Sequence, residues 1–170
     1  MKKTVIKFYS NFEKEEQWLN RMAAQGWHCT DYALGRYVFE KGEPGEYIYR
    51  LQLLDYPAAH AESAAYLAFL EETGVEVIAT WFRWVFLRKK AADGPFEIFS
   101  DRESRISHYK KVIAMLLPIT IFNLIMGMRA LLDGPRLYSV NLFAGVIAIF
   151  PLISYYQRTL LLHKEGRIRE

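Results

Sequence analysis

Two residues with reactive side chains, His28 and Cys29, are adjacent in the sequence and could together bind a metal ion or supply a thiol nucleophile. Neighbouring side chains of a strand point to opposite faces, so the pair cannot easily share a metal ion. Asp31 alone is a poor base for activating a thiol. We therefore expect Cys29 to be a small buried side chain. We predict no catalytic residue, no metal ligand and no cofactor. The glutamates at 13–16 fall in the first turn of an expected helix, where the helix dipole favours acids without any chemistry.

Aromatic residues are abundant in the segments expected to form strands, and they give the stronger functional signal. Along residues 81–87 both alternating faces are apolar. A two-layer sheet needs only one apolar face, so the surplus predicts a covered second face. The cover could be a dimer partner, a lipid surface, a ligand in a groove, or the connector near Phe96 and Phe99. The residues predicted to line a ligand groove are Trp27, Tyr37, Tyr49, Arg50 and Trp84.

The segments that position these residues occur twice in the first ninety residues. Residues 3–41 and 46–89 each read as strand, helix, strand, strand. Trp18, Leu19, Met22 and Gly26 match Tyr66, Leu67, Leu70 and Gly74 at one constant offset of 48 residues, which indicates an internal repeat. We predict that residues 1–90 form an α+β domain, with one antiparallel-rich sheet and two helices on one of its faces.

This duplicated order of elements resembles the effector-binding domains of the gyrase-inhibitor-like class. The resemblance is one of fold, and it implies a site for an apolar or cationic ligand between the repeats. A small apolar ligand is therefore one expected partner.

The second half of the chain is far more apolar than a soluble domain. Residues 112–157 contain two long apolar runs, 112–132 and 137–156, each long enough to cross a bilayer core of about 30 Å. Gly134 and Pro135 lie between them and predict a tight turn, so we expect a two-helix transmembrane hairpin. The alternative is two buried helices of a soluble bundle, but such helices carry a polar stripe at helical spacing. The candidate contacts to partner helices, or across the hairpin, are Asn123 and Asn141.

The charge distribution predicts how the hairpin is oriented. The connector and juxtamembrane helix at 91–111 and the basic tail at 158–170 carry more Lys and Arg than the turn, where Arg129 and Arg136 lie. The positive-inside rule then places both termini in the cytoplasm, with the protein in the cell membrane. The single cysteine is consistent with a reducing compartment. A net charge of +3 does not suggest a nucleic-acid binder.

Five short motifs are distinctive in combination: Phe12-Glu13-Lys14-Glu15-Glu16-Gln17-Trp18-Leu19-Asn20, Gly26-Trp27, Tyr37-Val38-Phe39-Glu40, Tyr47-Ile48-Tyr49-Arg50-Leu51 and Ser100-Asp101-Arg102-Glu103-Ser104. In these motifs the chain resembles the DUF2812 family of bacterial membrane proteins over residues 4–110. The second repeat departs from the family pattern, with Gly74-Val75 in place of a Gly-Trp pair. Similar proteins are often encoded beside PadR-type regulators, which implies a regulatory setting and assigns no catalytic residues.

Taken together, these features favour a non-enzymatic, membrane-tethered sensing or regulatory module. One alternative is an accessory subunit of a larger membrane complex, such as a transporter, with a protein partner or a second copy bound to the helices. Another is a lipid-acting enzyme, which would need to assemble a site from scattered residues such as His28 and Asp31. A transporter on its own is not expected, because two helices without a charge at mid-membrane do not readily form a transport pathway.

Overall fold

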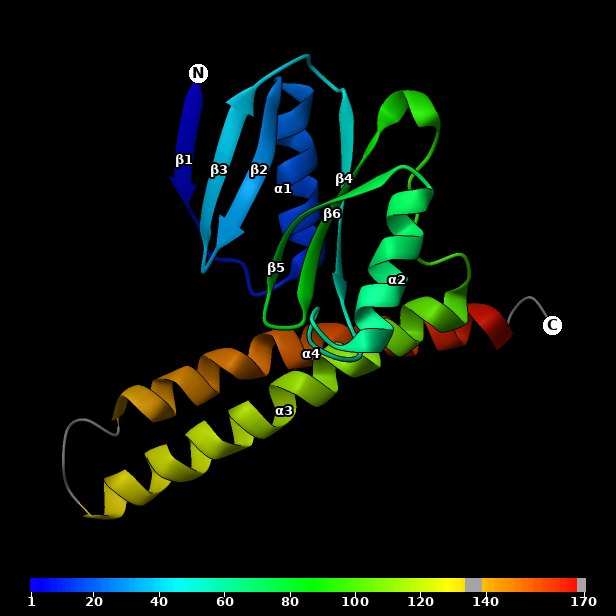
Figure 1. The fold of residues 1–170 in the computed structure, drawn as a ribbon. Coiled ribbons are helices and arrows are strands. Elements are labelled where there is room, and N and C mark those ends of the chain that lie inside the picture. The colour runs from blue at the N-terminus through cyan, green and yellow to red at the C-terminus, as the bar shows by residue number, and fades with distance from the viewer. Residues whose placement is uncertain (134–138, 168–170) are drawn as a thin grey trace. The chain divides into compact units, whose positions relative to one another are not determined.

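The computed structural model describes residues 1–133 and 139–167, which fall into two compact units. Unit 1 is Met1–Ile98, and unit 2 begins at Phe99. Figure 1 labels the helices and strands of both units. The turn predicted at Gly134 and Pro135, and the basic residues Arg136 and Arg169, lie outside the described residues.

The first repeat of unit 1 forms a helix and a three-stranded antiparallel sheet with strand order β1-β3-β2. Its elements are β1 (Lys2–Ile6), α1 (Phe12–Ala24), β2 (Trp27–Ala33) and β3 (Arg36–Lys41). Helix α1 begins at Asn11, whose side chain accepts a hydrogen bond from the backbone N–H of Lys14. Gly26, with φ +75°, lets the chain turn out of the helix.

The second repeat has the same elements and the same strand order, β4-β6-β5. They are β4 (Tyr47–Leu53), α2 (Ala61–Glu72), β5 (Val75–Trp81) and β6 (Trp84–Lys90), and a short 3-10 turn, η1 (Ala91–Asp93), follows. A β-bulge between Cys29 and Asp31 in β2 recurs between Val77 and Ala79 in β5, each residue 48 positions after its counterpart. The structure thus confirms the predicted duplication.

The α+β class is confirmed, but the prediction of a single sheet is wrong. The hydrogen bonds form two three-stranded sheets, one for each repeat. Strands β2 and β5, at the edges of the two sheets, come close to each other without pairing. The physical reason is that each of these edge strands contains a bulge, which bends the strand and interrupts the pattern needed for pairing with a neighbour.

Both faces of the second sheet are covered within unit 1. Helix α2 and the connector after β6 cover one face, over a buried cluster of Leu54, Val75, Val85, Leu87 and Phe96. On the other face Phe86 stacks on Tyr32 and contacts Tyr37, both from the first repeat. The surplus of apolar residues in β6 is therefore explained by packing between the repeats, with the connector contributing Phe96.

Unit 2 is a hairpin of two long helices, α3 (Arg102–Asp133) and α4 (Ser139–Arg167), which pack along each other. Residues 102–111 form one continuous helix with the first apolar run, and both helices continue through their internal prolines, Pro118 and Pro151. Two glycines allow the close approach of the helices. A Cβ atom on Gly127 would clash with the backbone of Leu142, and one on Gly145 would lie 2.8 Å from the side chain of Leu124.

Both helices of unit 2 are long and apolar enough to cross a membrane, over Arg102–Leu132 and Val140–Glu165. Only 17% and 11% of their apolar windows are buried. Core helices of a soluble bundle would bury most of this surface, because water does not solvate it favourably. The two helices are therefore candidate membrane spans, which supports an association of the protein with a membrane.

Candidate functional site between the two repeats

A carboxyl group is buried where the repeats of unit 1 meet. Glu15 of α1 is 8% exposed, and the Tyr37 hydroxyl of β3 donates a 2.5 Å hydrogen bond to its Oε1 atom. Burial raises the pKa of Glu15 to about 7, although the hydrogen bond from Tyr37 lowers it. The Glu15 carboxyl therefore exchanges its proton near neutral pH, far above its ordinary pKa of 4.5.

Aromatic rings surround the Glu15–Tyr37 pair. The rings of Trp18 and Tyr32 each lie 4.8 Å from the ring of Tyr37, and Tyr32 stacks at 4.1 Å on Phe86 of the second repeat. The face of an aromatic ring carries partial negative charge and attracts cations. A carboxylate beside such rings is a chemical environment that suits an apolar cation.

Helix α1 also closes the exposed edge of β4, an outer strand of the second sheet. The Asn20 side chain accepts a hydrogen bond from the Tyr49 N–H at 2.9 Å and donates one to the Tyr49 carbonyl at 3.0 Å. Glu16 accepts a 2.7 Å hydrogen bond from the Leu51 N–H. Because Glu16 and Asn20 are four residues apart on one helix face, α1 takes the place of a neighbouring strand. Burial raises the pKa of Glu16 to about 7 as well, against the lowering effects of the Leu51 N–H and of Arg50.

Arg88 of β6 joins the repeats from the other side. Its guanidinium group bonds to Glu76 of β5 at 2.6 Å and donates to the Cys29 carbonyl of β2 at 3.4 Å. It also lies 4.2 Å from the centre of the Tyr47 ring. We call the whole contact zone, from Glu15 to Arg88, the seam.

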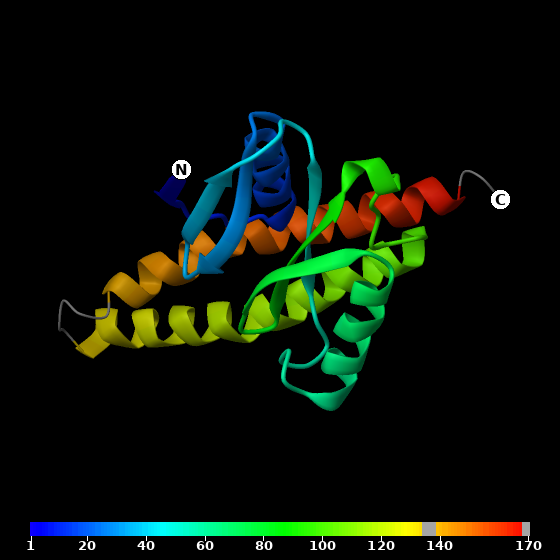
Figure 2. The same ribbon diagram turned by 45° about the horizontal axis from the view of Figure 1, so that its top comes forward.

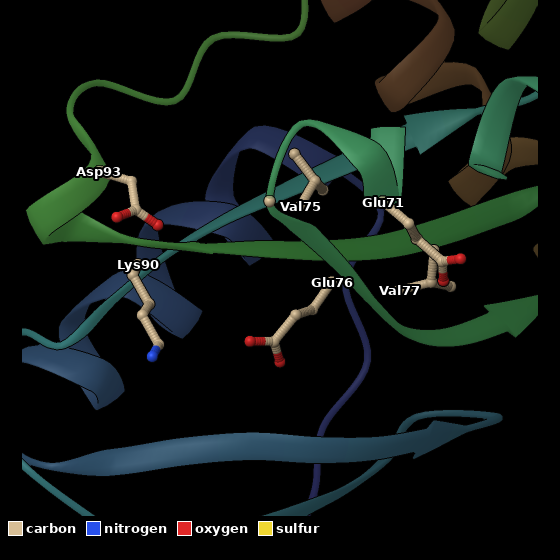
Figure 3. A pocket seen from close by; sticks show the side chains of 7 residues that line it. Glu71, Val75, Glu76, Val77, Lys90 and Asp93 are labelled. Atoms are coloured by element: carbon tan, nitrogen blue, oxygen red, sulfur yellow. The ribbon is translucent and has the colours of Figure 1, made fainter. Parts of the chain in front are cut away.

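An open groove lies along β5 next to the seam (Figure 3). Its volume is about 610 Å³, and its lining consists of Glu71, Gly74, Val75, Glu76, Val77, Lys90 and Asp93. Figure 3 shows the side chains of Glu76 and Lys90 extending in the same direction from the sheet. Three carboxylates against one ammonium group make the groove acidic. Its open form gives a small molecule little enclosure.

Two of the five predicted groove residues lie at the seam. Tyr37 and Tyr49 are each 1% exposed, and the Tyr49 hydroxyl donates to the Cys29 carbonyl at 3.4 Å. Trp84 lies close by in β6, with its ring 5.6 Å from the ring of Phe12. The structure thus places Tyr49 and Trp84 in the second sheet on the face that packs against the first repeat, whereas Tyr37 belongs to the first repeat and contacts Phe86 of that face.

The other two predicted residues lie elsewhere. The Trp27 ring lies beneath the ammonium groups of Lys3 and Lys41, each about 5 Å from the ring centre. Arg50 forms an ion pair with Glu97 at 2.8 Å, next to the connector. Neither residue contributes to the cluster around Glu15.

Glu15, Glu16 and Asn20 were missed from the sequence because acids in a first helical turn need no special explanation. One signal could have found Glu15. The buried positions of α1 are Phe12, Glu15, Leu19, Met22 and Ala23, so Glu15 falls at helical spacing within the apolar stripe. A carboxyl group at a position where the helix pattern calls for an apolar side chain is the feature that could have indicated the site.

His28 and Cys29 are both buried. The prediction that Cys29 is a small buried side chain is confirmed. The His28 Nε2 atom lies 2.8 Å from the Glu43 carbonyl. Burial raises the pKa of the Cys29 thiol to about 12, so the thiol stays protonated. In unit 2, the Asn123 side chain donates to the Ile119 carbonyl of its own helix, and Asn141 is half-buried near the start of α4.

The fold and site define a duplicated α+β module with a buried carboxyl at its seam, joined to an apolar helical hairpin. A family profile described as "Protein of unknown function (DUF2812)" matches residues 11–121, which include both helices of unit 1 and the start of α3. The chain belongs to this family. No curated protein and no solved structure matches the chain significantly.

Proposed function

We propose that this protein is a membrane-tethered, non-enzymatic sensing module that binds an apolar cation at the seam between its repeats. The observation that carries the proposal is the buried carboxyl of Glu15 inside an aromatic cluster. An ionised carboxyl is unfavourable in such a place unless a charge compensates it. A bound cation would supply that charge, and departures from ordinary core composition occur most often at functional sites.

The ligand would enter by parting the repeats at the stack of Tyr32 on Phe86. Its positive charge would then face Glu15, and its apolar surface would contact the rings of Tyr32 and Trp18. The Tyr37 hydroxyl would give up its hydrogen bond to Glu15 or share it. Because the proton and the cation compete for one carboxylate, ligand affinity would fall as the pH drops through about 7.

Parting the seam would also supply an output. Glu16 and Asn20 of α1 accept hydrogen bonds from the backbone N–H groups of Leu51 and Tyr49 in β4. If α1 moved away, this edge would be free to pair with a strand of a partner protein. Binding of the ligand would thereby allow a partner protein to bind at β4, as expected of a regulatory module.

Unit 2 would hold the sensor at the cell membrane of a bacterium. In this proposal α3 and α4 span the bilayer as a hairpin, with both termini in the cytoplasm. The Lys and Arg residues at 102–111 and 158–164 lie at the two cytoplasmic ends, as the positive-inside rule requires. The sensing unit would then face the cytoplasm.

Affinity purification of the full-length protein in mild detergent tests the proposal, with mass spectrometry of all co-eluting molecules. The comparison is between the wild type, Glu15→Gln and, as a matched control, Glu62→Gln, which changes an exposed carboxyl of α2. We expect an organic cation to co-elute with the wild type and the control and to be depleted from Glu15→Gln. A stoichiometric protein partner retained by all three, without a small molecule, would instead support an accessory subunit of a membrane complex.

A further inference from the structure

The tips of the two β-hairpins give unit 1 one strongly apolar end. The β2–β3 turn is Leu34-Gly35 and the β5–β6 turn is Phe82-Arg83, and Leu34 and Phe82 are 64% and 69% exposed. Both hairpin tips lie at the same end of unit 1 in two views (Figures 1 and 2). The most exposed apolar side chains of the two repeats are therefore presented in the same direction.

Neighbouring residues extend this apolar end. Ile6 and Phe8 are each 72% exposed, and Phe8 packs so closely on the first turn that a Cβ atom at Gly35 would lie 2.5 Å from its ring. The Lys7 N–H donates to the Gly35 carbonyl at 2.8 Å, which fixes this segment beside the turn. We call the exposed apolar residues of this end the tip patch: Ile6, Phe8, Leu34, Trp81 and Phe82.

Folding does not account for Leu34 and Phe82. Their φ angles are +45° and +56°, a left-handed conformation in which bulky residues are disfavoured and glycine is preferred. Two-residue hairpin turns normally use Asn, Asp or Gly at such positions. The two residues occupy equivalent positions of the repeats, so the same unfavourable choice occurs twice. A large exposed side chain there stabilises neither the turn nor the core.

We infer that the tip patch inserts into the headgroup region of a lipid bilayer, as a membrane contact of unit 1 itself. Trp, Phe, Leu and Ile at loop tips are the side chains that favour a membrane interface. Cationic groups lie beside them: Lys7 is exposed, Arg83 follows Phe82, and Arg36 follows the first turn. Asp31 pairs with Arg36, and the ammonium group of Lys7 is a cation that suits anionic headgroups.

Lipid is the expected partner of the tip patch because the same chain carries two candidate membrane spans, and α3 begins only a few residues after unit 1 ends. A bilayer is therefore within reach whenever the hairpin is inserted. Insertion of the tip patch would hold the sensing unit at the membrane surface, a role beyond the tether supplied by α3 and α4.

Depth-dependent fluorescence quenching tests this inference on the full chain in nanodiscs that contain anionic phosphatidylglycerol. Cys29, which is buried, is replaced by alanine, and an environment-sensitive dye is attached at Ile6→Cys in the tip patch. The matched control carries the dye at Phe69→Cys, an exposed apolar position on α2 outside the patch. We expect a blue-shifted emission and quenching by spin-labelled lipid at position 6, and neither effect at position 69.

A second variant separates insertion from folding. Leu34→Gly combined with Phe82→Gly removes two apolar tips while relieving both left-handed positions, so unit 1 should fold at least as stably. Lipid quenching at position 6 should nevertheless decrease. Equal exposure of positions 6 and 69 to an aqueous quencher would overturn the inference. Protection of position 6 without lipid quenching would also overturn it, because a protein or a second copy would then cover the patch.

Discussion

The hydroxyl of Tyr37 donates a 2.5 Å hydrogen bond to the carboxyl of Glu15, and this bond joins β3 to α1 in the interior of unit 1. Its surroundings are apolar, since Leu19, Cys29 and Phe39 are each exposed by 1% or less. The pair is therefore a polar contact in a place where folding alone would favour hydrocarbon. The stability of unit 1, its proton binding and the proposed ligand site therefore all depend on this hydrogen bond.

The stability of unit 1 should depend on pH through Glu15. Its pKa rises from 4.5 to about 7 on folding, so the folded state binds the proton more tightly than the unfolded state. The free energy of unfolding should then be largest below pH 4.5 and decrease as the pH rises through about 7. The loss attributable to Glu15 is at most about 3 kcal/mol, at 1.36 kcal/mol for each pKa unit.

Urea unfolding of the full chain in detergent, followed by tryptophan fluorescence, measures this dependence. Glu15→Gln should flatten the pH profile, because glutamine does not titrate, and the exposed Glu62→Gln should leave it unchanged. Glu16 contributes in the same direction, so a residual slope is expected in Glu15→Gln. A Glu15→Gln profile parallel to that of the wild type would contradict the buried titration.

Tyr37→Phe should destabilise unit 1 by about 1–3 kcal/mol, because the buried carboxyl loses its hydrogen-bond donor. The loss should be larger at high pH, where Glu15 is ionised. Tyr37→Phe combined with Glu15→Met removes both polar partners and should recover most of the stability. A double-mutant cycle with additive effects would show that the two residues do not interact.

Asn20→Ala should weaken the attachment of α1 to β4, because both backbone groups of Tyr49 lose their side-chain partner. We expect a loss of about 1–3 kcal/mol in urea unfolding. Gln17→Ala, at an exposed position of the same helix, is the control and should change stability by less than about 0.5 kcal/mol. Equal effects of the two substitutions would mean that α1 does not close the strand edge.

Gly145→Leu should disrupt the hairpin of unit 2, because a Cβ at this position already lies 2.8 Å from Leu124 of α3. The neighbouring Ala144 is exposed, so Ala144→Leu adds the same side-chain type without a clash. Thermal unfolding in detergent should show a lower midpoint for Gly145→Leu alone. Similar midpoints for the two variants would contradict the close packing of the helices.

Local patterns were sufficient to predict most of the fold. The helices that end at Gly and the strands that follow them were predicted from residue types close together in the sequence. The constant offset of 48 residues then indicated that these elements form two repeats. The division into two sheets could not be predicted, because it depends on the bulges near Cys29 and Val77. The residue types at these positions do not indicate a bulge. The apolar runs of unit 2 were visible from composition alone.

The candidate site was only partly predictable. Tyr37 and Tyr49 were named because an apolar surplus in the strands requires a cover; both are buried at the seam, and their role as ligand contacts stays a prediction. Trp27 was predicted from the same surplus and Arg50 as a contact for a polar ligand group, but contacts with Lys3, Lys41 and Glu97 place both residues elsewhere. Glu15 was missed because an acid in the first turn of a helix needs no special explanation, although its position within the apolar stripe of α1 could have identified it.

Equilibrium binding of tetraphenylphosphonium to the full chain in detergent micelles tests the central claim most directly, with tetraphenylborate as an anion of the same shape and size. The wild type should bind the cation more tightly at about pH 8 than at about pH 6, because Glu15 loses its proton in that interval. Glu15→Gln should bind the cation at least about tenfold more weakly, a loss of about 1.4 kcal/mol, and the anion should show no such difference. Equal affinity of the wild type and Glu15→Gln for the cation at both pH values would contradict the proposal that the seam is a cation site.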